Sequence, residues 1–288
     1  MKKLSPLVLA CIAATWLVWG STYLAIKFAL VSFPPFFQMS TRFLVAGTLL
    51  LAWTTFRGQP FPTLVQWRNA LLVGALMLGG GMGCTAYAEQ TVASGLVVAF
   101  IAVTPALIAL ASLPFGIKPS KLEACGIGVG LAGVLLLVRG TGFSASPAGL
   151  AAVMISTTAW STGSVLSQHR LPLAKGATGF ASEMICGGCV LMLMSHIRGE
   201  VFHWPPQALA LSAWIYLVTF GSLIAFSAYM VLLARTSAAL ATSYSFVNPV
   251  IAMLLGIAFA GETVSGYEWL AVGVIIVGVV MLVLGRRA

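Results

Sequence analysis

Charge is what this chain has least of. Only 7% of its 288 residues are charged and 60% are hydrophobic, whereas an ordinary soluble domain carries about 25% charged residues. The mean hydropathy is +1.03. No water-soluble core has this composition, and short loops leave no room for an extramembrane domain. The sequence therefore predicts an all-α integral membrane protein.

Acidic residues are the scarcest charged group. All six are glutamates, and we expect each at or near the end of a hydrophobic segment: Glu89, Glu123, Glu183, Glu200, Glu262 and Glu268. A proton-driven exporter commonly carries its proton on an acidic or histidine side chain inside the membrane. Because no carboxylate is expected at mid-membrane depth, the sequence favours a facilitator over a proton-coupled transporter.

Reactive and metal-binding patterns are also missing. The five cysteines lie in apolar segments and form no disulfide framework, and the Cys186 and Cys189 pair lacks further ligands for zinc. His169, His196 and His203 show no pattern of a metal site or a catalytic triad. The sequence predicts no catalytic residue, metal or cofactor. The net charge of +9 comes from basic residues that stand singly, which argues against nucleic-acid binding.

Long hydrophobic runs are what the chain does have. About twenty helical residues cross the roughly 30 Å hydrocarbon core of a bilayer. Residues rich in glycine and proline separate ten such runs. The predicted spans are 6–27, 36–56, 69–88, 94–115, 121–139, 148–168, 178–197, 211–233, 239–260 and 266–285.

The first span follows a Met-Lys-Lys start that resembles a signal peptide. The run continues through Trp16, Trp19 and Tyr23 without a clear cleavage site, so we expect an uncleaved helix.

The basic residues predict the orientation. Eleven of the 15 fall on the side of the N-terminus: Lys2, Lys3, Arg57, Arg68, Lys118, Lys121, Arg170, Lys175, Arg235, Arg286 and Arg287. Lys27 and Arg42 are expected at outer helix ends, with side chains that reach the interface in preference to binding substrate. Since cytoplasmic loops carry the excess of Lys and Arg, both termini are predicted in the cytoplasm of a bacterial-type inner membrane.

Two spans carry a proline near their middle. In Leu96 to Phe115, Pro105 lacks an N–H and its ring pushes away the carbonyl of Ile101, which predicts a kink. The pattern returns 144 residues later with Pro249, which frees the Ser245 carbonyl. Interrupted helices at matching positions of two halves are a sequence indicator of a transporter's binding site. We therefore expect Pro105 and Pro249 to act as gating kinks.

Other segments repeat at similar spacing. Trp19 aligns with Trp160 at an offset of 141 residues, and Tyr87 aligns with Tyr229 at 142. Each repeat would hold five spans, and an odd number of spans turns the second copy upside down. The predicted fold is ten transmembrane helices as two inverted five-helix repeats, residues 1–140 and 147–288.

These segments resemble a known family. The segments that show the resemblance are WGSTYLAIKFAL (Trp19 to Leu30), RFLVAGTLLL (Arg42 to Leu51), the stretch Tyr87 to Ala111 with its copy around Asn248-Pro249, and Gly261 to Leu282. They look like the EamA-type members of the drug/metabolite transporter superfamily, and most like its amino acid exporters, the aromatic amino acid exporters included. The resemblance implies a central cavity lined by helices 1, 3, 4, 6, 8 and 9 and export of amino acids or other small metabolites.

Polar and aromatic residues at helical spacing are the candidates for the lining of that cavity. Membrane-interface anchoring of Trp and Tyr and packing between helices are the alternative interpretations. The candidates are Thr15, Trp19, Tyr23, Cys84, Tyr87, Phe100, Thr104, Ser156, Trp160, Ser164, Phe226, Tyr229, Tyr244, Ser245 and Asn248.

The lining has aromatic rings, hydroxyls and one amide but no carboxylate for a cation, so it favours a small neutral or zwitterionic solute. Proton-coupled export of drugs or other metabolites is the alternative, ahead of a lipid-modifying enzyme or a scaffold. The GxxxG of Gly126 and Gly130, continued by Gly133, predicts close helix packing within a monomer or a homodimer.

Overall fold

The structure is a computed structural model that describes residues 4–92, 97, 100–137, 146–260 and 266–285. These ranges contain helices and connecting segments and no strand. The basic residues Lys2, Lys3, Arg139, Arg286 and Arg287 lie outside the described residues, as does Glu262, and so does the side chain of Glu268.

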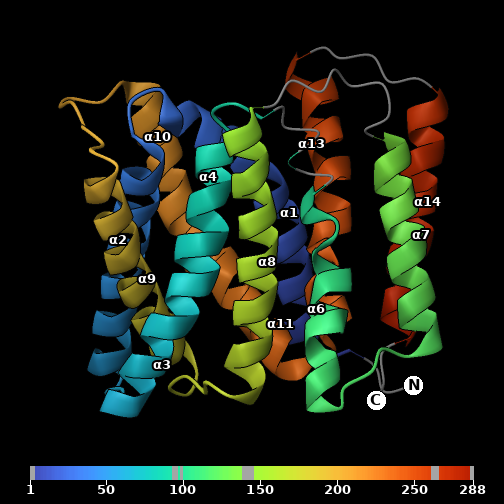
Figure 1. Ribbon diagram of the computed structural model, residues 1–288, viewed down its shortest axis with the longest axis horizontal. Helices are drawn as coiled ribbons and strands as arrows, with labels where there is room; N and C mark the ends of the chain where they lie inside the picture. The colour runs from blue at the N-terminus through green and yellow to red at the C-terminus, as the bar shows by residue number, and fades with distance from the viewer. Residues whose placement is uncertain (1–3, 93–96, 98–99, 138–145, 261–265, 286–288) are drawn as a thin grey trace.

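The helices follow one another with short connections (Figure 1). Their bounds are α1 Pro6–Leu30, α2 Pro35–Phe56, α3 Leu64–Gly74, α4 Cys84–Ala88, α6 Thr104–Ser112, α7 Lys121–Leu137, α8 Pro147–His169, α9 Ala177–Ile197, α10 Ala208–Tyr216, α11 Ser227–Arg235, α12 Ala238–Ala241, α13 Tyr244–Ala260 and α14 Gly266–Gly285. The 3-10 turn η2, Leu113–Phe115, ends α6.

Six stretches within the described ranges are long and apolar enough to cross a membrane: Pro6–Leu30, Pro35–Phe56, Leu64–Ala88, Pro147–His169, Ala177–Ile197 and Ala208–Arg235. Two shorter apolar helices accompany them, Thr104–Phe115 and Trp269–Gly285. The molecule is thus an all-helical protein with multiple membrane-spanning segments, as the composition predicts.

Local capping fixes where several helices begin. The Ser5 hydroxyl accepts from the Val8 amide ahead of Pro6, and the Ser146 hydroxyl accepts from the Gly149 amide ahead of Pro147. At α3, Thr63 and Gln66 form a capping box. The third span therefore starts at Leu64, five residues before the predicted position 69, because a polar cap sets the boundary where hydropathy alone misses the first turn.

The prediction of a kink at Pro105 is wrong in form. The helix is broken before the proline, since Ala102 and Val103 form a turn and α6 begins at Thr104. Pro105 then lies in the first turn of α6, where backbone N–H groups have no partner within the helix, so its missing N–H costs no hydrogen bond. In the other half, Thr242 and Ser243 separate α12 from α13, and Pro249 does lie inside α13 as expected.

Two long helices contain π-helical segments that the sequence analysis does not predict. The segment η1, Ala75–Gly83, joins α3 to α4, and η3, Leu217–Phe226, joins α10 to α11. Their starting residues are 142 positions apart, the spacing that relates Tyr87 to Tyr229. π-helical turns are rare and frequently occur at functional sites.

Figure 1 shows how the helices are arranged. The α2 and α9 pair lies at one side, the α7 and α14 pair at the other, and α1, α8 and α13 lie between them. A Cβ at Gly126 would lie 2.9 Å from the Gly278 carbonyl oxygen, so the predicted glycine face of α7 does pack closely, against α14.

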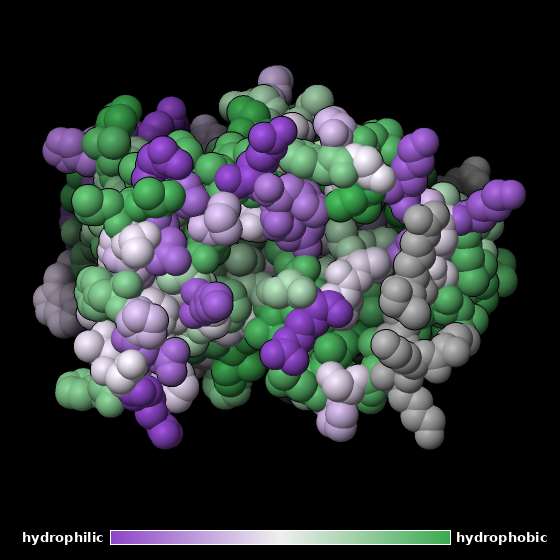
Figure 2. Space-filling view, turned by 90° about the horizontal axis from the view of Figure 1, so that it is seen from below, coloured by the Kyte–Doolittle hydropathy of each residue, from purple (hydrophilic) through white to green (hydrophobic). Residues whose placement is uncertain are grey.

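Helix α1 begins and α14 ends at the same end of the bundle, which is at the bottom of Figure 1 and is called the lower end here. Figure 2 shows the molecule from this end, with hydrophilic side chains spread over the face among apolar ones.

Candidate functional site

Four aromatic side chains from four helices meet at the centre of the bundle. Trp19 of α1 lies against Trp160 of α8, Tyr229 of α11 and Tyr244 of α13, with ring centroids 5.6, 5.2 and 4.6 Å away. Tyr229 is fully buried, and the other three side chains are at most 6% exposed. These distances and the tilted or edge-to-face angles are the preferred geometry of aromatic pairs. We call these four residues the aromatic cluster.

Hydrogen bonds hold the aromatic cluster to the helices around it. The Trp19 indole donates to the carbonyl of Gly221 in η3 at 3.3 Å. The hydroxyls of Ser164 and Tyr229 lie 2.9 Å apart. In contrast, the indole nitrogen of Trp160 has no hydrogen-bond partner in the part of the chain that the structure describes. The hydroxyls of Tyr229 and Tyr244 lie close to this nitrogen, so the Trp160 N–H is a donor held next to two hydroxyls at the centre of the protein.

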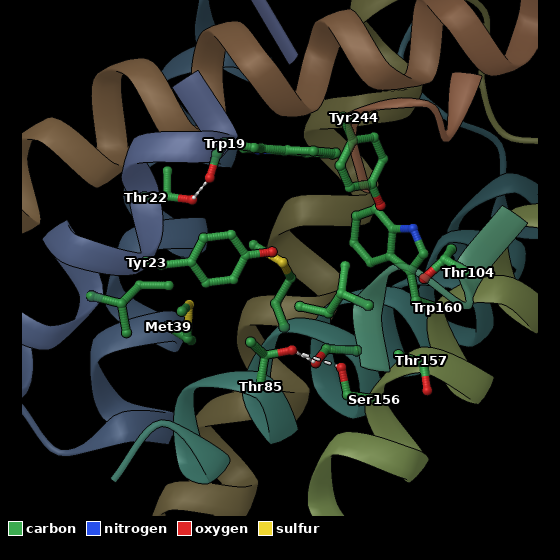
Figure 3. A pocket seen from close by; sticks show the side chains of 14 residues that line it. Trp19, Thr22, Tyr23, Met39, Thr85, Thr104, Ser156, Thr157, Trp160 and Tyr244 are labelled. Atoms are coloured by element: carbon green, nitrogen blue, oxygen red, sulfur yellow. Dashed lines mark hydrogen bonds between the residues drawn. The ribbon is translucent and has the colours of Figure 1, made fainter. Parts of the chain in front are cut away.

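A small cavity of about 50 Å³ borders the cluster (Figure 3). Six of the residues predicted from the sequence line it: Trp19, Tyr23, Thr104, Ser156, Trp160 and Tyr244. The sequence analysis missed the other lining residues: Thr22, Ile26, Met39, Gly81, Met82, Thr85, Ile101 and Thr157. Figure 3 shows the Thr85 and Ser156 hydroxyls joined across the cavity wall, at 2.6 Å.

This cavity is much smaller than the roughly 300 Å³ at which small-molecule pockets begin. A cavity of about 1030 Å³ lies at the lower end, between the end of α8, the start of α9 and the end of α11. Its wall includes Gln168, Phe180 and Met230. The central cavity is thus closed around its aromatic residues while a wide cavity exists at one end of the bundle.

The remaining predicted residues lie elsewhere. The Thr15 hydroxyl bonds the carbonyls of its own helix at Cys11 and Ile12, and the Ser245 hydroxyl bonds the Thr242 carbonyl, so both are directed to local backbone. Cys84, Tyr87 and Phe100 pack against a separate apolar cluster around Val92 and Ala152. Phe226, Tyr229 and Ser164 pack next to Trp160 without lining the cavity.

Asn248 is 1% exposed, and neither atom of its amide has a hydrogen-bond partner in the described ranges. Its side chain lies near the Tyr23 hydroxyl, which lines the central cavity. Burying an amide without hydrogen-bond partners is costly. We therefore take the Asn248 amide, one turn into α13, as a candidate contact for a polar ligand.

Arg42 is not where the sequence analysis places it. It is fully buried, so the prediction that its side chain reaches the membrane interface is wrong. Its Nε donates to the Ser222 hydroxyl at 2.6 Å and its Nη1 lies 3.6 Å from the Met39 sulfur, while Nη2 has no partner among the described residues. A long side chain near a helix end can turn inward as easily as outward, and the sequence pattern does not distinguish the two. Lys27, by contrast, is exposed.

Glu183 also departs from expectation. It is the seventh residue of α9 and is completely buried, with no partner for either carboxylate oxygen in the described ranges. Glu89, just after α4, is 6% exposed and similarly lacks partners. Glu123 does lie in the first turn of α7, where it accepts from the Ser120 amide. Glu200 follows the end of α9 and accepts from the amides of Phe36 and Phe37 at the start of α2.

The fold and the site together define a multi-pass helical membrane protein with a closed, aromatic central cavity. The chain belongs to the EamA-like transporter family, which it matches twice, over residues 5–139 and 147–284. The family predicted from the sequence is thus confirmed.

Relatives and a solved structure cover nearly the full chain. The chain is 43% identical to the uncharacterized inner membrane transporter YedA of Escherichia coli strain K12, over 99% of this chain and 93% of YedA. It is 28% identical to a chloroplastic WAT1-related protein of Arabidopsis thaliana, over 92% of this chain and 66% of that protein. A crystal structure at 24% identity covers 98% of both chains with a TM-score of 0.78, which shows the shared fold.

Proposed function

We propose that this protein exports small neutral or zwitterionic metabolites, and that amino acids with aromatic or other hydrophobic side chains are its main substrates. It works by alternating access as a facilitator. The observation that carries the proposal is the central cavity, where Trp19, Trp160 and Tyr244 meet hydroxyl groups and none of the described lining residues is a carboxylate. Aromatic faces bind apolar rings, and a few placed polar groups orient the rest of a ligand.

The transport cycle follows from the two cavities. In this conformation the cavity at the lower end is wide, at about 1030 Å³, and the central one is closed, at about 50 Å³. A solute enters from the lower end when the aromatic cluster separates, and it leaves when the opposite end opens. The breaks before α6 and α13 lie beside the central cavity, since Thr104 and Tyr244 begin these helices and line it. Helix breaks of this kind let half-helices tilt as gates.

The architecture that we propose is ten spans in two inverted repeats. The two family matches, over residues 5–139 and 147–284, support it. The π-helical segments η1 and η3 support it independently, since they interrupt the third and eighth predicted spans.

We place the protein in the inner membrane, as the name of the E. coli relative suggests for that protein. Arg57, Arg68, Arg170, Lys175 and Arg235 flank the lower ends of helices α2, α3, α8, α9 and α11. By the positive-inside rule the lower end faces the cytoplasm.

Proton-coupled transport is the second candidate, and one observation favours it. Glu183 is completely buried, and neither of its carboxylate oxygens has a partner in the described ranges. Because burying an ionised carboxylate without a partner is costly, this group is suited to carry a proton. The described residues that line the central cavity still include no acidic side chain, which is why facilitated export remains the main proposal.

The experiment is an uptake screen. Liposomes that contain the purified protein are loaded with unlabelled phenylalanine. The entry of labelled phenylalanine, tryptophan, alanine, lysine or an organic cation is then measured by counterflow. We expect phenylalanine and tryptophan to enter faster than lysine or the cation. Equal entry of all solutes, or a preference for the cation, would contradict the proposal.

A further inference from the structure

The Arg42 guanidinium is a buried positive charge that requires an anion. Arginine stays protonated in proteins, so it cannot avoid the cost of burial by becoming neutral, as a buried carboxyl can. Its contacts are neutral: the Ser222 hydroxyl, the Met39 sulfur and the Phe43 ring, whose centroid is 4.9 Å from Cζ. Nη2 is left with no hydrogen-bond partner in the described part of the chain.

Four of the protein's own carboxylates lie in the described ranges with recorded side-chain positions, and none is paired with Arg42. Glu200 accepts the backbone amides at the start of α2, and Glu123 accepts an amide at the start of α7. Glu89 lies in the electrostatic reach of Lys27 and Tyr23, and Glu183 in that of Tyr229. None of these four forms a recorded contact with Arg42, so the anion is not supplied by them.

Two cavity-lining residues, Met39 and Thr22, lie beside Arg42 or next to its neighbour Gly221. Met39, whose sulfur lies next to Nη1, lines the cavity. On the other side, a Cβ at Gly221 would lie 2.7 Å from Nη2 and 3.4 Å from a methyl carbon of Thr22, which also lines the cavity. Because residue 221 is a glycine, the guanidinium fits against η3 at the point where the Trp19 indole donates to the Gly221 carbonyl.

We propose that Arg42 binds the carboxylate of the transported solute and thereby selects solutes that carry one. The inference rests on the proposed function and narrows it to carboxylate-bearing substrates. Met39 is the movable part of the wall, since methionine is unbranched and flexible. When the cavity expands and Met39 turns aside, Nη1 and Nη2 face the solute as a fork that matches a carboxylate.

This assignment gives the solute an orientation. In this assignment the carboxylate lies against α2 at Arg42, and the apolar side chain lies on the aromatic cluster. Figure 3 shows Met39, whose sulfur lies next to Arg42, across the cavity from Trp160 and Tyr244. Ser222 holds Nε and keeps the guanidinium plane fixed, so it positions the fork without touching the solute.

The test compares phenyl-bearing ligands with and without a carboxylate. Binding of phenylalanine, phenylalaninamide, 3-phenylpropionate and phenethylamine to the detergent-purified protein is measured by calorimetry. We expect the wild type to bind phenylalanine and 3-phenylpropionate at least about tenfold more tightly than the two amines that lack a carboxylate, as charge-assisted pairing to a carboxylate implies. In Arg42→Gln this preference is lost, while Arg198→Gln, which removes an exposed cation, keeps it.

Arg42→Lys is the control for folding, because it keeps the positive charge but not the two parallel N–H donors of the guanidinium. We expect this variant to remain monodisperse, and we expect the ratio of its affinities for acids and amines to fall at least about threefold from the wild-type value. The proposal is overturned if Arg42→Gln keeps the preference for acids. If Arg42→Gln does not fold, an unchanged preference in Arg42→Lys overturns it. So does a wild type that binds acid and amide equally.

The same ligands separate this proposal from the transport proposal. If 3-phenylpropionate binds the wild type and not Arg42→Gln while phenylalanine is not transported, then Arg42 is a carboxylate site and amino acid export is wrong. If phenylalanine is transported and the acid preference is independent of Arg42, the export proposal stands and this inference fails.

Discussion

Arg42 and Glu183 are 141 residues apart, the spacing that also relates Trp19 to Trp160, and both are completely buried. They lie on α2 and α9, which pack directly on each other: the Ser40 hydroxyl donates to the Gly188 carbonyl at 2.8 Å. One residue is basic and the other acidic, yet the Nη2 of Arg42 and both oxygens of Glu183 lack hydrogen-bond partners within the part of the chain that the structure describes. Two positions that share this spacing thus carry different chemistry, a basic side chain on α2 and an acidic one on α9.

The aromatic cluster gives the first prediction. Trp160→Ala removes a ring that contacts both Trp19 and Tyr229, so we expect counterflow of phenylalanine to fall at least about tenfold. Trp160→Phe keeps a ring and should retain a measurable part of the rate. Trp204→Ala is the matched control, because this tryptophan is 77% exposed, and its rate should equal that of the wild type. Normal transport by Trp160→Ala would remove the cluster from the substrate path.

The prolines give the second prediction. The structure indicates that replacing Pro249 and replacing Pro105 will affect transport to different extents. Pro249 lies inside α13, where Pro249→Ala restores a backbone hydrogen bond and stiffens the helix next to its break. Pro105 lies in the first turn of α6, where no bond is restored. Transport should slow in Pro249→Ala and change little in Pro105→Ala, with both variants monodisperse after purification. Equal rates in all three proteins would show that Pro249 does not contribute to gating.

Helix packing gives the third prediction. Gly126→Leu places a side chain where a Cβ already meets the Gly278 carbonyl at 2.9 Å, so the α7 and α14 pair must separate. Overpacking of this kind costs about 1–3 kcal/mol, and the thermal midpoint of the purified protein should fall. Gly128→Leu, two residues along the same helix, meets nothing within 4 Å and should leave the midpoint unchanged or higher. A midpoint that responds equally to both changes would contradict the close packing of α7 on α14.

Topology gives the fourth prediction. Reporter fusions should place the C-terminus in the cytoplasm and the loop from Gly140 to Pro147 outside, as the basic residues predict. The readout is reporter activity on each side of the membrane. A C-terminus on the outer side would contradict both the orientation and an even number of spans.

Much of the fold is readable from the sequence because hydropathy and proline or glycine punctuation act locally. The ends of α1, α2, α8 and α9 fall within about three residues of the predicted spans. The break at Ala102 and Val103 is less readable, since Pro105 fits either a kinked helix or the first turn of a new one. The π-helical segments have no sequence signal of comparable strength.

The site is less readable than the fold. Helical spacing finds Trp19, Trp160 and Tyr244, because large aromatic residues with hydroxyl neighbours are distinctive. It misses Met39 and Thr22, which are ordinary packing residues in any single helix and line the cavity only through tertiary contact. The same limit applies to Arg42 and Glu183, whose burial depends on which way neighbouring helices turn.

Energy coupling is the last prediction, and Glu183 is the residue on which it depends. The nearby titratable groups are Cys186 on the same helix and Tyr229 on α11, and no cation is recorded in contact with it in the described ranges. Facilitated export predicts that a transmembrane pH step does not drive accumulation of phenylalanine when the membrane potential is clamped. Glu183→Gln, which imitates the protonated acid, should then transport at the wild-type rate.

Proton coupling predicts a different pair of results. Phenylalanine would accumulate only with the pH step, and Glu183→Gln would lose this accumulation but keep counterflow, because the amide fills the same space without exchanging a proton. Glu200→Gln is the control, since Glu200 caps the start of α2 through the amides of Phe36 and Phe37; it changes folding stability but not the response to the pH step. Accumulation that requires the pH step and Glu183 would therefore overturn the facilitator and assign the proton to the buried carboxyl of α9.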